Sequence, residues 1–178
     1  MGNENPDTDA RLRFMSALAQ TAKRDDPTRL VSAACLVDTV ANKISDRLAD
    51  FLDVIGINEY YGWYNPNFSL LPQCFANSRV TKPVVVSEWG AGARAGFHGT
   101  ADDLFSEEMQ KAVYEKQVTI LGKIPAVRGM SPWTLFDFRC PRRHNRYQRG
   151  YNLKGVLSAD KKHKKLAFYV LQRFYMGK

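Results

Sequence analysis

The sequence predicts an α/β fold built on parallel strands. Short apolar segments rich in β-branched residues alternate with longer segments of helical periodicity along the 178 residues. This alternation favours a parallel sheet with packed helices over an antiparallel sheet. A content of 44% hydrophobic residues is ample for a core. No Ser/Gly-rich linker, low-complexity tract or internal repeat interrupts the sequence, so we expect residues 1–178 to form a single domain.

The first part of the chain is assigned to two helices and two strands. A helix is expected over Asp9–Arg24, because Pro6 disfavours helix in the residue before it and the acidic residues nearby suit a helix N-terminus. Leu30–Leu36 is a short apolar run and predicts the first strand. A second helix is expected over Ala41–Leu52, and a second strand over Val54–Asn58.

The rest of the chain repeats this pattern. A short helix over Pro72–Ser78 precedes a strand over the β-branched run Val84–Glu88, and a helix over Ser106–Lys123 precedes a fourth strand over Gly129–Phe136. A final helix is expected over Lys162–Tyr175, because this segment is amphipathic and has Lys and Arg on its polar side. Its apolar side chains fall largely on the other side: Leu166, Phe168, Tyr169, Leu171 and Phe174.

The number of strands limits the architecture. A closed (β/α)8 barrel, the TIM barrel, has eight parallel strands and takes about 250 residues. This sequence has 178 residues and supplies four predicted strands. Four parallel strands cannot close such a barrel, and they are half of the number that it needs. The two edge strands of such a half would expose unpaired backbone groups, so we expect a homo-oligomer, most simply a dimer in which two copies complete the barrel.

The net charge of +8 is concentrated in one segment. Residues 139–165 hold ten basic residues and a single acidic one, Asp160. Such a run has three explanations: a solvated surface, a nucleic-acid or other polyanionic partner, or recognition of an anionic group on a substrate. No recognition-helix motif, ribonucleoprotein signature or zinc finger accompanies the run. We do not expect nucleic-acid binding, and a polyanion-binding protein is the weakest alternative.

Several other classes are disfavoured by composition. No apolar stretch approaches the roughly 20 residues that cross a bilayer, and the first residues lack the profile of a signal peptide. A cytoplasmic protein without membrane association is the default expectation. The cysteines are odd in number and far apart, and the histidines lack ligand spacing, so we predict no disulfide framework, metal or cofactor. These residues are Cys35, Cys74 and Cys140, and His98, His144 and His163.

One acidic residue is distinguished by its position. Glu88 closes the apolar run of the third predicted strand, and in barrels of alternating strands and helices the chemistry lies at the C-terminal ends of the strands. The alternative is a carboxylate that only caps a following helix. That alternative is weakened because Trp89-Gly90-Ala91-Gly92 follows instead of a helix start. The position therefore predicts a catalytic carboxylate.

Aromatic residues are placed where they could accompany this acid. Tyr60, Trp63 and Tyr64 follow the second predicted strand, and Trp133 lies within the fourth. Aromatic rings beside carboxylates suit sugars, whose C–H faces stack on rings while their hydroxyls bond to acids and amides. Ordinary core packing is the alternative. It applies more to Trp63 than to the two tyrosines, whose hydroxyls would need partners if buried.

Glycoside cleavage needs a second carboxylate, which protonates the leaving oxygen while the first attacks the sugar or activates water. Glu4 is the candidate, in the opening segment MGNENP. From its place in the sequence alone, a solvated N-terminal acid is the simpler interpretation of Glu4.

Four motifs, in order along the chain, resemble glycoside hydrolase family 2, the β-galactosidase and β-glucuronidase family. They are GNE at 2–4, NEYYGWY at 58–64, KP at 82–83 with SEWGA at 87–91, and WTLFDF at 133–138, with AGFH at 95–98 and SEE at 106–108 in addition. The resemblance covers essentially the whole chain. It implies the second half of the family's (β/α)8 catalytic barrel, strands five to eight, without the N-terminal sandwich domains and the first half-barrel.

The resemblance also implies roles for individual residues. Glu88 matches the nucleophile and Glu4 the general acid/base of a retaining exo-β-glycosidase. The matched substrate-binding positions are Asn3 at the sugar 2-hydroxyl, the active-site tyrosines Tyr60 and Tyr64, Trp133 in the wall of the sugar site, and Asn152 and Lys154 in the Asn-x-Lys element that β-glucuronidases use on the substrate carboxylate.

The sugar is left open by the resemblance. The same Asn-x-Lys spacing occurs in members called β-galactosidases, and a solvated side chain is the alternative for Lys154. Glu59 stands where β-glucuronidases carry Arg, which weakens the implication of an anionic substrate. The implied substrates are therefore terminal β-D-glucuronides or β-D-galactosides, hydrolysed by double displacement. Because half of the barrel is missing, the alternative is an inactive half-barrel that folds and self-assembles.

Overall fold

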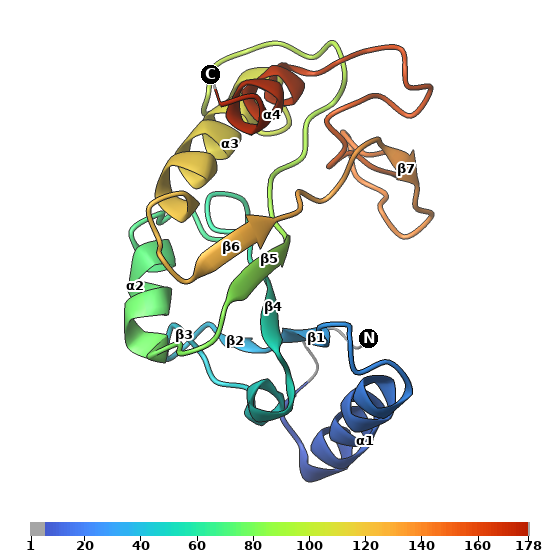
Figure 1. The fold of residues 1–178 in the computed structure, drawn as a ribbon. Coiled ribbons are helices and arrows are strands. Elements are labelled where there is room, and N and C mark those ends of the chain that lie inside the picture. The colour runs from blue at the N-terminus through green and yellow to red at the C-terminus, as the bar shows by residue number, and fades with distance from the viewer. Residues whose placement is uncertain (1–5, 178) are drawn as a thin grey trace. The chain divides into compact units, whose positions relative to one another are not determined.

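The computed structural model describes residues 6–177, and this part of the chain divides into two compact units (Figure 1). The first unit comprises residues 6–59, 69–88 and 122–131, and the second comprises residues 60–68, 89–121 and 132–177. The chain passes from the first unit to the second after Glu59, Glu88 and Ser131. Among the described residues, no helix is long and apolar enough to cross a membrane.

A four-stranded parallel sheet organises the first unit. Its order is β1–β4–β5–β6, and each neighbouring pair runs parallel. The central strands β4 (Val54–Asn58) and β5 (Val84–Glu88) have the predicted bounds. Ile55, Ile57, Val84 and Val86 are buried, and Gly56 lies so close to β1 that a Cβ atom there would be 2.7 Å from the Ala33 carbonyl oxygen. The predicted α/β class with a parallel sheet is therefore confirmed.

The edge strands differ from their predicted bounds. β1 is Ser32–Cys35, shorter than predicted, and β6 is Val127–Met130, which begins earlier than predicted and ends well before Phe136. β6 ends where Pro132 follows, since proline has no N–H to donate to a neighbouring strand. Trp133 therefore lies after the fourth strand, and the prediction that it lies within that strand is wrong.

The predicted helix over Ala41–Leu52 is also wrong. Its first part is a strand, β3 (Lys43–Ile44), which pairs antiparallel with β2 (Val37–Asp38), and only η1 (Arg47–Phe51) is helical, as a 3-10 helix. The Asp38 carboxylate accepts hydrogen bonds from the backbone N–H groups of Val40 and Ala41, and Asn42 has a positive φ of 48°. These contacts build a turn, which interrupts the helix that the apolar periodicity suggested.

Two α-helices complete the first unit. α1 (Asp9–Asp25) begins after the N-cap residue Thr8, whose side chain accepts a hydrogen bond from the Arg11 N–H. Arg11 then forms a bidentate ion pair with Asp46, at 2.9 and 2.7 Å, which joins α1 to the start of η1. α2 (Leu70–Ser78) begins two residues before the predicted start. Pro72 is tolerated there because the N–H groups of the first helical turn have no intrahelical partner.

The second unit contains a pair of helices and a short hairpin. α3 (Glu107–Leu121) and α4 (Leu166–Tyr175) pack against each other, and β7 (Phe138–Arg139) pairs antiparallel with β8 (Tyr151–Asn152). α3 confirms the predicted helix over Ser106–Lys123 within two residues at its C-terminal end. The N-terminal part of α3 contributes to a cluster of buried apolar residues, against which two aromatic rings pack: Ala91, Met109 and Val113, with Trp63 and Phe68.

α4 begins four residues later than predicted. Before it, the Asp160 carboxylate accepts a hydrogen bond from the Lys162 N–H and Lys161 has a φ of 64°, so this segment forms a turn. The buried face of α4 also differs from the predicted one. Of the five apolar residues expected on that face only Leu171 is buried, Tyr169 is exposed, and the buried stripe is Ala167, Val170 and Leu171.

Candidate active site

Polar side chains end the two central strands of the first unit. Glu88 is the last residue of β5, and it is in register with Asn58, the last residue of β4. The Glu59 N–H donates a hydrogen bond to the Glu88 carbonyl at 2.9 Å. Ser87 Oγ lies 2.8 Å from Asn58 Oδ1 and also bonds to the Ile57 carbonyl at 3.0 Å. Glu88 is thus held at the C-terminal end of a buried strand, the position from which its catalytic role was predicted.

In the second unit, a buried lysine lies over a group of aromatic rings. Lys154 is 3% exposed, and its Nζ lies 3.4 Å from the ring centroid of Tyr60, 4.4 Å from that of Tyr64 and 5.5 Å from that of Trp63. The electron-rich face of an aromatic ring attracts a cation at such distances. The alternative of a solvated Lys154 is therefore wrong, because burial and the three rings fix its side chain.

The aromatic residues divide by role. The Tyr60 and Tyr64 rings meet edge-to-face at 5.4 Å, and Tyr64 remains exposed. Trp63 packs instead against the apolar cluster of the second unit and edge-to-face on Phe105 at 5.1 Å. Core packing, the alternative considered for Trp63, thus accounts for part of its surroundings. The two tyrosines and Lys154 are the predicted substrate-binding residues that the structure brings together.

Asn152 acts on the backbone of the Asn-x-Lys element. It lies on β8, is buried, and its Oδ1 accepts a hydrogen bond from the Lys154 N–H at 3.1 Å. Such a bond from a side chain to the backbone two residues on closes an Asx turn. Asn152 therefore sets the direction in which the Lys154 side chain leaves the backbone.

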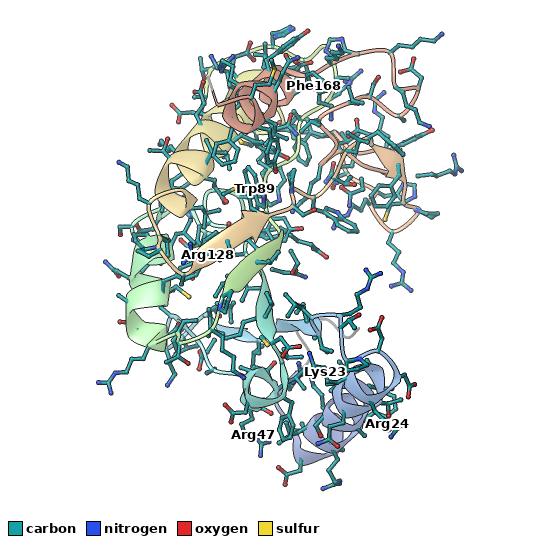
Figure 2. The ribbon with its side chains drawn as sticks, in the orientation of Figure 1. Lys23, Arg24, Arg47, Trp89, Arg128 and Phe168 are labelled. Carbon is teal, nitrogen blue, oxygen red and sulfur yellow. The ribbon has the colours of Figure 1, made fainter. Side chains whose placement is uncertain are left out.

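Trp133 lies in the segment after β6 and contacts residues of the second unit. Its ring lies 6.1 Å from that of Phe138, edge-to-face, and its N–H donates to the Trp89 carbonyl at 2.9 Å. Trp89, labelled in Figure 2, directly follows Glu88 in the sequence and is fully buried. The segment of Trp133 is thereby anchored to the residue after the predicted nucleophile.

The basic run of the sequence is partly an ordered surface loop. The connection from β7 to β8 carries arginines at 142, 143, 146 and 149, directly after Arg139. Hydrogen bonds from the Cys140 N–H to the Gly150 carbonyl and from the Gly150 N–H to the Arg143 carbonyl, both 2.8 Å, close the loop. Tyr147 stacks on Phe105 at 4.9 Å. All of these arginines except Arg143, which is half-buried, are exposed, so the loop presents positive charge to solvent.

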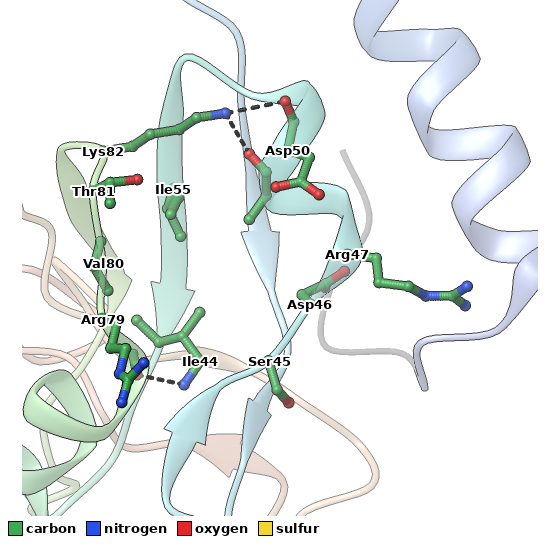
Figure 3. A pocket seen from close by; sticks show the side chains of 12 residues that line it. Ile44, Ser45, Asp46, Arg47, Asp50, Ile55, Arg79, Val80, Thr81 and Lys82 are labelled. Carbon is green, nitrogen blue, oxygen red and sulfur yellow. Dashed lines mark hydrogen bonds between the residues drawn. The ribbon is translucent and has the colours of Figure 1, made fainter.

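A pocket of about 290 Å³ lies elsewhere in the first unit, at the N-terminal side of β4 and β5 (Figure 3). The ammonium of Lys82 donates there to the carbonyls of Ala49, Asp50 and Leu52 at 2.8–3.1 Å and so caps the end of η1. The Arg47 side chain points away from the pocket and pairs with Asp7. Residues at the N-terminal ends of barrel strands serve stability. This pocket is therefore not the candidate active site.

Two predicted site residues, Asn3 and Glu4, lie outside the described residues. Within residues 6–177, no group of His, Cys, Asp and Glu side chains is arranged to hold a metal ion. Sequence reasoning missed Ser87, Phe105 and the buried pair of Asp137 and Lys165, whose ammonium lies 2.7 Å from the carboxylate. The only signal in the sequence was that Ser87 directly precedes Glu88. The contacts of Phe105, Asp137 and Lys165 join residues far apart along the chain.

Comparison with known proteins agrees with this geometry. Residues 1–177 match the family model of the glycosyl hydrolases family 2, TIM barrel domain. A β-glucuronidase of Paenibacillus borealis is 30% identical over 176 residues, which are 93% of this chain and 28% of that protein. The human β-glucuronidase is 29% identical over 172 residues, which are 91% of this chain and 26% of that protein.

A solved structure extends the comparison to the fold. The crystal structure of a GH2 β-galacturonidase from Eisenbergiella tayi, bound to galacturonate, superimposes with a TM-score of 0.86 at 26% identity and covers 99% of this chain and 32% of that one. The chain thus spans about a quarter to a third of the length of these relatives. A polar C-terminal edge on a parallel sheet and a match over nearly the whole chain lead to one conclusion: the chain belongs to glycoside hydrolase family 2 and corresponds to its TIM barrel domain.

Proposed function

We propose that this chain supplies the catalytic carboxylates and the sugar-binding residues of a retaining exo-β-glycosidase that acts on terminal β-uronides. The observation that carries the proposal is Lys154, a buried ammonium held over the Tyr60 and Tyr64 rings by the Asn-x-Lys element. A lysine in such a setting suits the carboxylate of a uronic acid, since ion pairing strengthens where water is excluded. A neutral galactoside offers no group of that charge.

The relatives support the same substrate class. The P. borealis and human relatives are named β-glucuronidases, and the E. tayi β-galacturonidase is bound to galacturonate. Both sugars carry a carboxylate at C6. Glu59, which by the resemblance stands where β-glucuronidases carry Arg, is buried and directly follows β4. We propose that this difference affects which uronic acid is preferred and leaves the requirement for a carboxylate intact.

The proposed reaction is a double displacement. The Glu88 carboxylate attacks the anomeric carbon and forms a glycosyl ester, while Glu4 protonates the departing glycosidic oxygen. Glu4 then takes a proton from water, whose oxygen attacks the anomeric carbon and releases Glu88. Retention of configuration by this route needs two carboxyl groups about 5–5.5 Å apart.

Turnover of chromogenic substrates by the chain tests this proposal. We expect release of nitrophenol from nitrophenyl β-D-glucuronide and much slower release from the β-D-galactoside. The variants Glu88→Gln and Glu4→Gln control for contaminating glycosidases, because they keep the side-chain volume and remove the carboxylate. Equal rates on both sugars would contradict the proposed substrate class.

A second candidate is a half-barrel that folds and self-assembles without turnover. It is favoured by the four-stranded sheet, whose edge strands are β1 and β6. Unpaired strand edges favour association with another chain. Under this proposal residues 1–178 are one domain, strands five to eight of the barrel.

The same sheet edges lead to a prediction on oligomeric state. We expect the chain to form a homodimer at micromolar concentration, because a two-fold interface lets the same incomplete surface pair with itself. Light scattering coupled to size-exclusion chromatography measures the mass, for which the monomer value is 20.2 kDa. A monomer that unfolds cooperatively and binds no hydrophobic dye would show that the sheet needs no second copy.

A further inference from the structure

The backbone of the Asn-x-Lys element is held at every position from 153 to 155. The Leu153 carbonyl accepts from the Ala93 N–H at 2.9 Å, and the Lys154 carbonyl accepts from the Thr134 N–H at 3.1 Å. The Gly155 carbonyl accepts from Gln110 Nε2 at 3.1 Å. Residues 153–155 are therefore fixed by hydrogen bonds from three separate parts of the second unit.

A buried ammonium group is the centre of these contacts. Lys165 is fully buried, and its Nζ donates to the Asp137 carboxylate at 2.7 Å, to the Ala93 carbonyl at 2.5 Å and to the Leu153 carbonyl at 3.2 Å. These acceptors use all three N–H groups of the ammonium. The same Asp137 Oδ1 also accepts from the Gly155 N–H at 2.9 Å. The ion pair is thus hydrogen-bonded to the residues on both sides of Lys154, which are Leu153 and Gly155.

Lys165 and Gly155 are themselves fixed by neighbouring backbone. Lys165 is the N-cap residue of α4, and its own N–H donates to the Val156 carbonyl at 2.9 Å. Gly155 lies so close to the segment opposite that a Cβ atom there would be 2.1 Å from the Asp137 nitrogen. No other residue fits at that distance, so the approach of the two segments depends on glycine.

The pair is retained although burial opposes its charges. Burial raises the pKa of Asp137 to about 6, against the opposing effect of the Lys165 ammonium, and burial lowers the pKa of Lys165. Apolar residues of similar volume in place of a buried ion pair are often neutral or stabilising. Stability alone therefore gives little reason for this pair, whereas its two directed hydrogen bonds to the segment around Lys154, at Leu153 and Gly155, do.

We propose that Asp137 and Lys165 are positioning residues, which hold the segment Asn152–Gly155 so that the Lys154 ammonium lies over the Tyr60 and Tyr64 rings. The expected effect on substrate binding rests on the proposed function, in which Lys154 binds the carboxylate of a uronide. The position of Lys154 over the rings does not depend on that function, because it can be measured without substrate.

The double variant Asp137→Leu/Lys165→Met tests the structural part. The side-chain methylene protons of Lys154 next to the ammonium are expected to resonate upfield of their usual range by NMR, because they lie over aromatic rings. In the variant we expect at least half of that upfield shift to be lost, since the directed contacts to Leu153 and Gly155 are gone. The variant Asp137→Asn/Lys165→Met replaces it if the first variant lacks a native far-UV circular dichroism spectrum, because it leaves no unpaired buried charge.

A matched control is available in the first unit. Arg11 and Asp46 form another buried ion pair, whose carboxylate likewise accepts backbone N–H groups, from Leu36 and Leu48. The variant Arg11→Met/Asp46→Leu is expected to leave the Lys154 resonances unchanged. An unchanged upfield shift in the Asp137/Lys165 variant, or an equal loss in the control, would overturn the positioning role.

Turnover separates this inference from the proposed function. In preparations that hydrolyse a uronide, the Asp137→Leu/Lys165→Met variant is expected to raise KM for the glucuronide about tenfold with kcat within about twofold, because a displaced Lys154 weakens substrate binding. If Lys154→Ala itself leaves the sugar preference unchanged, the proposed function fails. The NMR result then still decides whether the pair positions Lys154.

Discussion

A fluorosugar inactivator of the correct configuration is expected to become covalently attached to Glu88 in any active assembly that contains this chain. Such a sugar forms the glycosyl ester but slows its hydrolysis, so the intermediate accumulates on the nucleophile. Proteolysis and mass spectrometry should locate the added mass on a peptide that contains Glu88. In Glu88→Gln we expect turnover to fall by several orders of magnitude, because removal of a nucleophile abolishes the covalent step.

The control for this experiment is a carboxylate on the surface of α3. Glu115 pairs with Lys111 at 3.7 Å and is half exposed, so Glu115→Gln should label and turn over like the unchanged chain. Label that persists in Glu88→Gln, or that attaches to another acid, would assign the nucleophile elsewhere.

The second large effect is expected from Lys154→Ala, which should reduce kcat/KM on the glucuronide by about 100-fold and on the galactoside by less than about threefold. Only the uronide brings a carboxylate, which would be left without its cationic partner in a site that excludes water. The ratio of the two specificity constants is the measurement. A general loss of structure would lower both constants together and leave their ratio unchanged.

Lys164→Ala is the matched control for Lys154→Ala. Lys164 also lies over an aromatic ring in the second unit, with its Nζ 4.9 Å from the Phe168 centroid, but it is exposed. The ratio of the specificity constants should be unaffected by this variant. If Lys154→Ala lowers kcat/KM equally on both sugars, the role of Lys154 is structural.

The central strands and Glu88 were predictable from the sequence because the information lies within a few residues. The runs over 54–58 and 84–88 are short, apolar and rich in β-branched residues, and such runs favour buried strands. An acid that ends such a run in a parallel sheet must lie at the C-terminal edge. The role of Lys154 came from the resemblance, and the structure adds its burial and the three rings.

The errors arose where a local contact or a distant partner overrides the apolar pattern. Residues 41–52 show helical periodicity, yet the Asp38 carboxylate accepts hydrogen bonds from the N–H groups of Val40 and Ala41. These bonds form a turn in place of the first part of the expected helix. Lys165 follows three other lysines within a short run and looks solvated in the sequence. Its carboxylate partner, Asp137, is 28 residues away, and no periodicity reveals such a pair.

The ordered arginine loop between β7 and β8 has a consequence for association kinetics. Its guanidinium groups are carried on a loop closed by backbone hydrogen bonds, so their positive potential has a fixed location in the second unit. A fixed potential of this kind accelerates the diffusional encounter of anions, and dissolved salt screens it over about 10 Å at 0.1 M. The bimolecular rate constant for an anionic ligand should therefore fall as ionic strength rises, while that for an uncharged ligand stays constant.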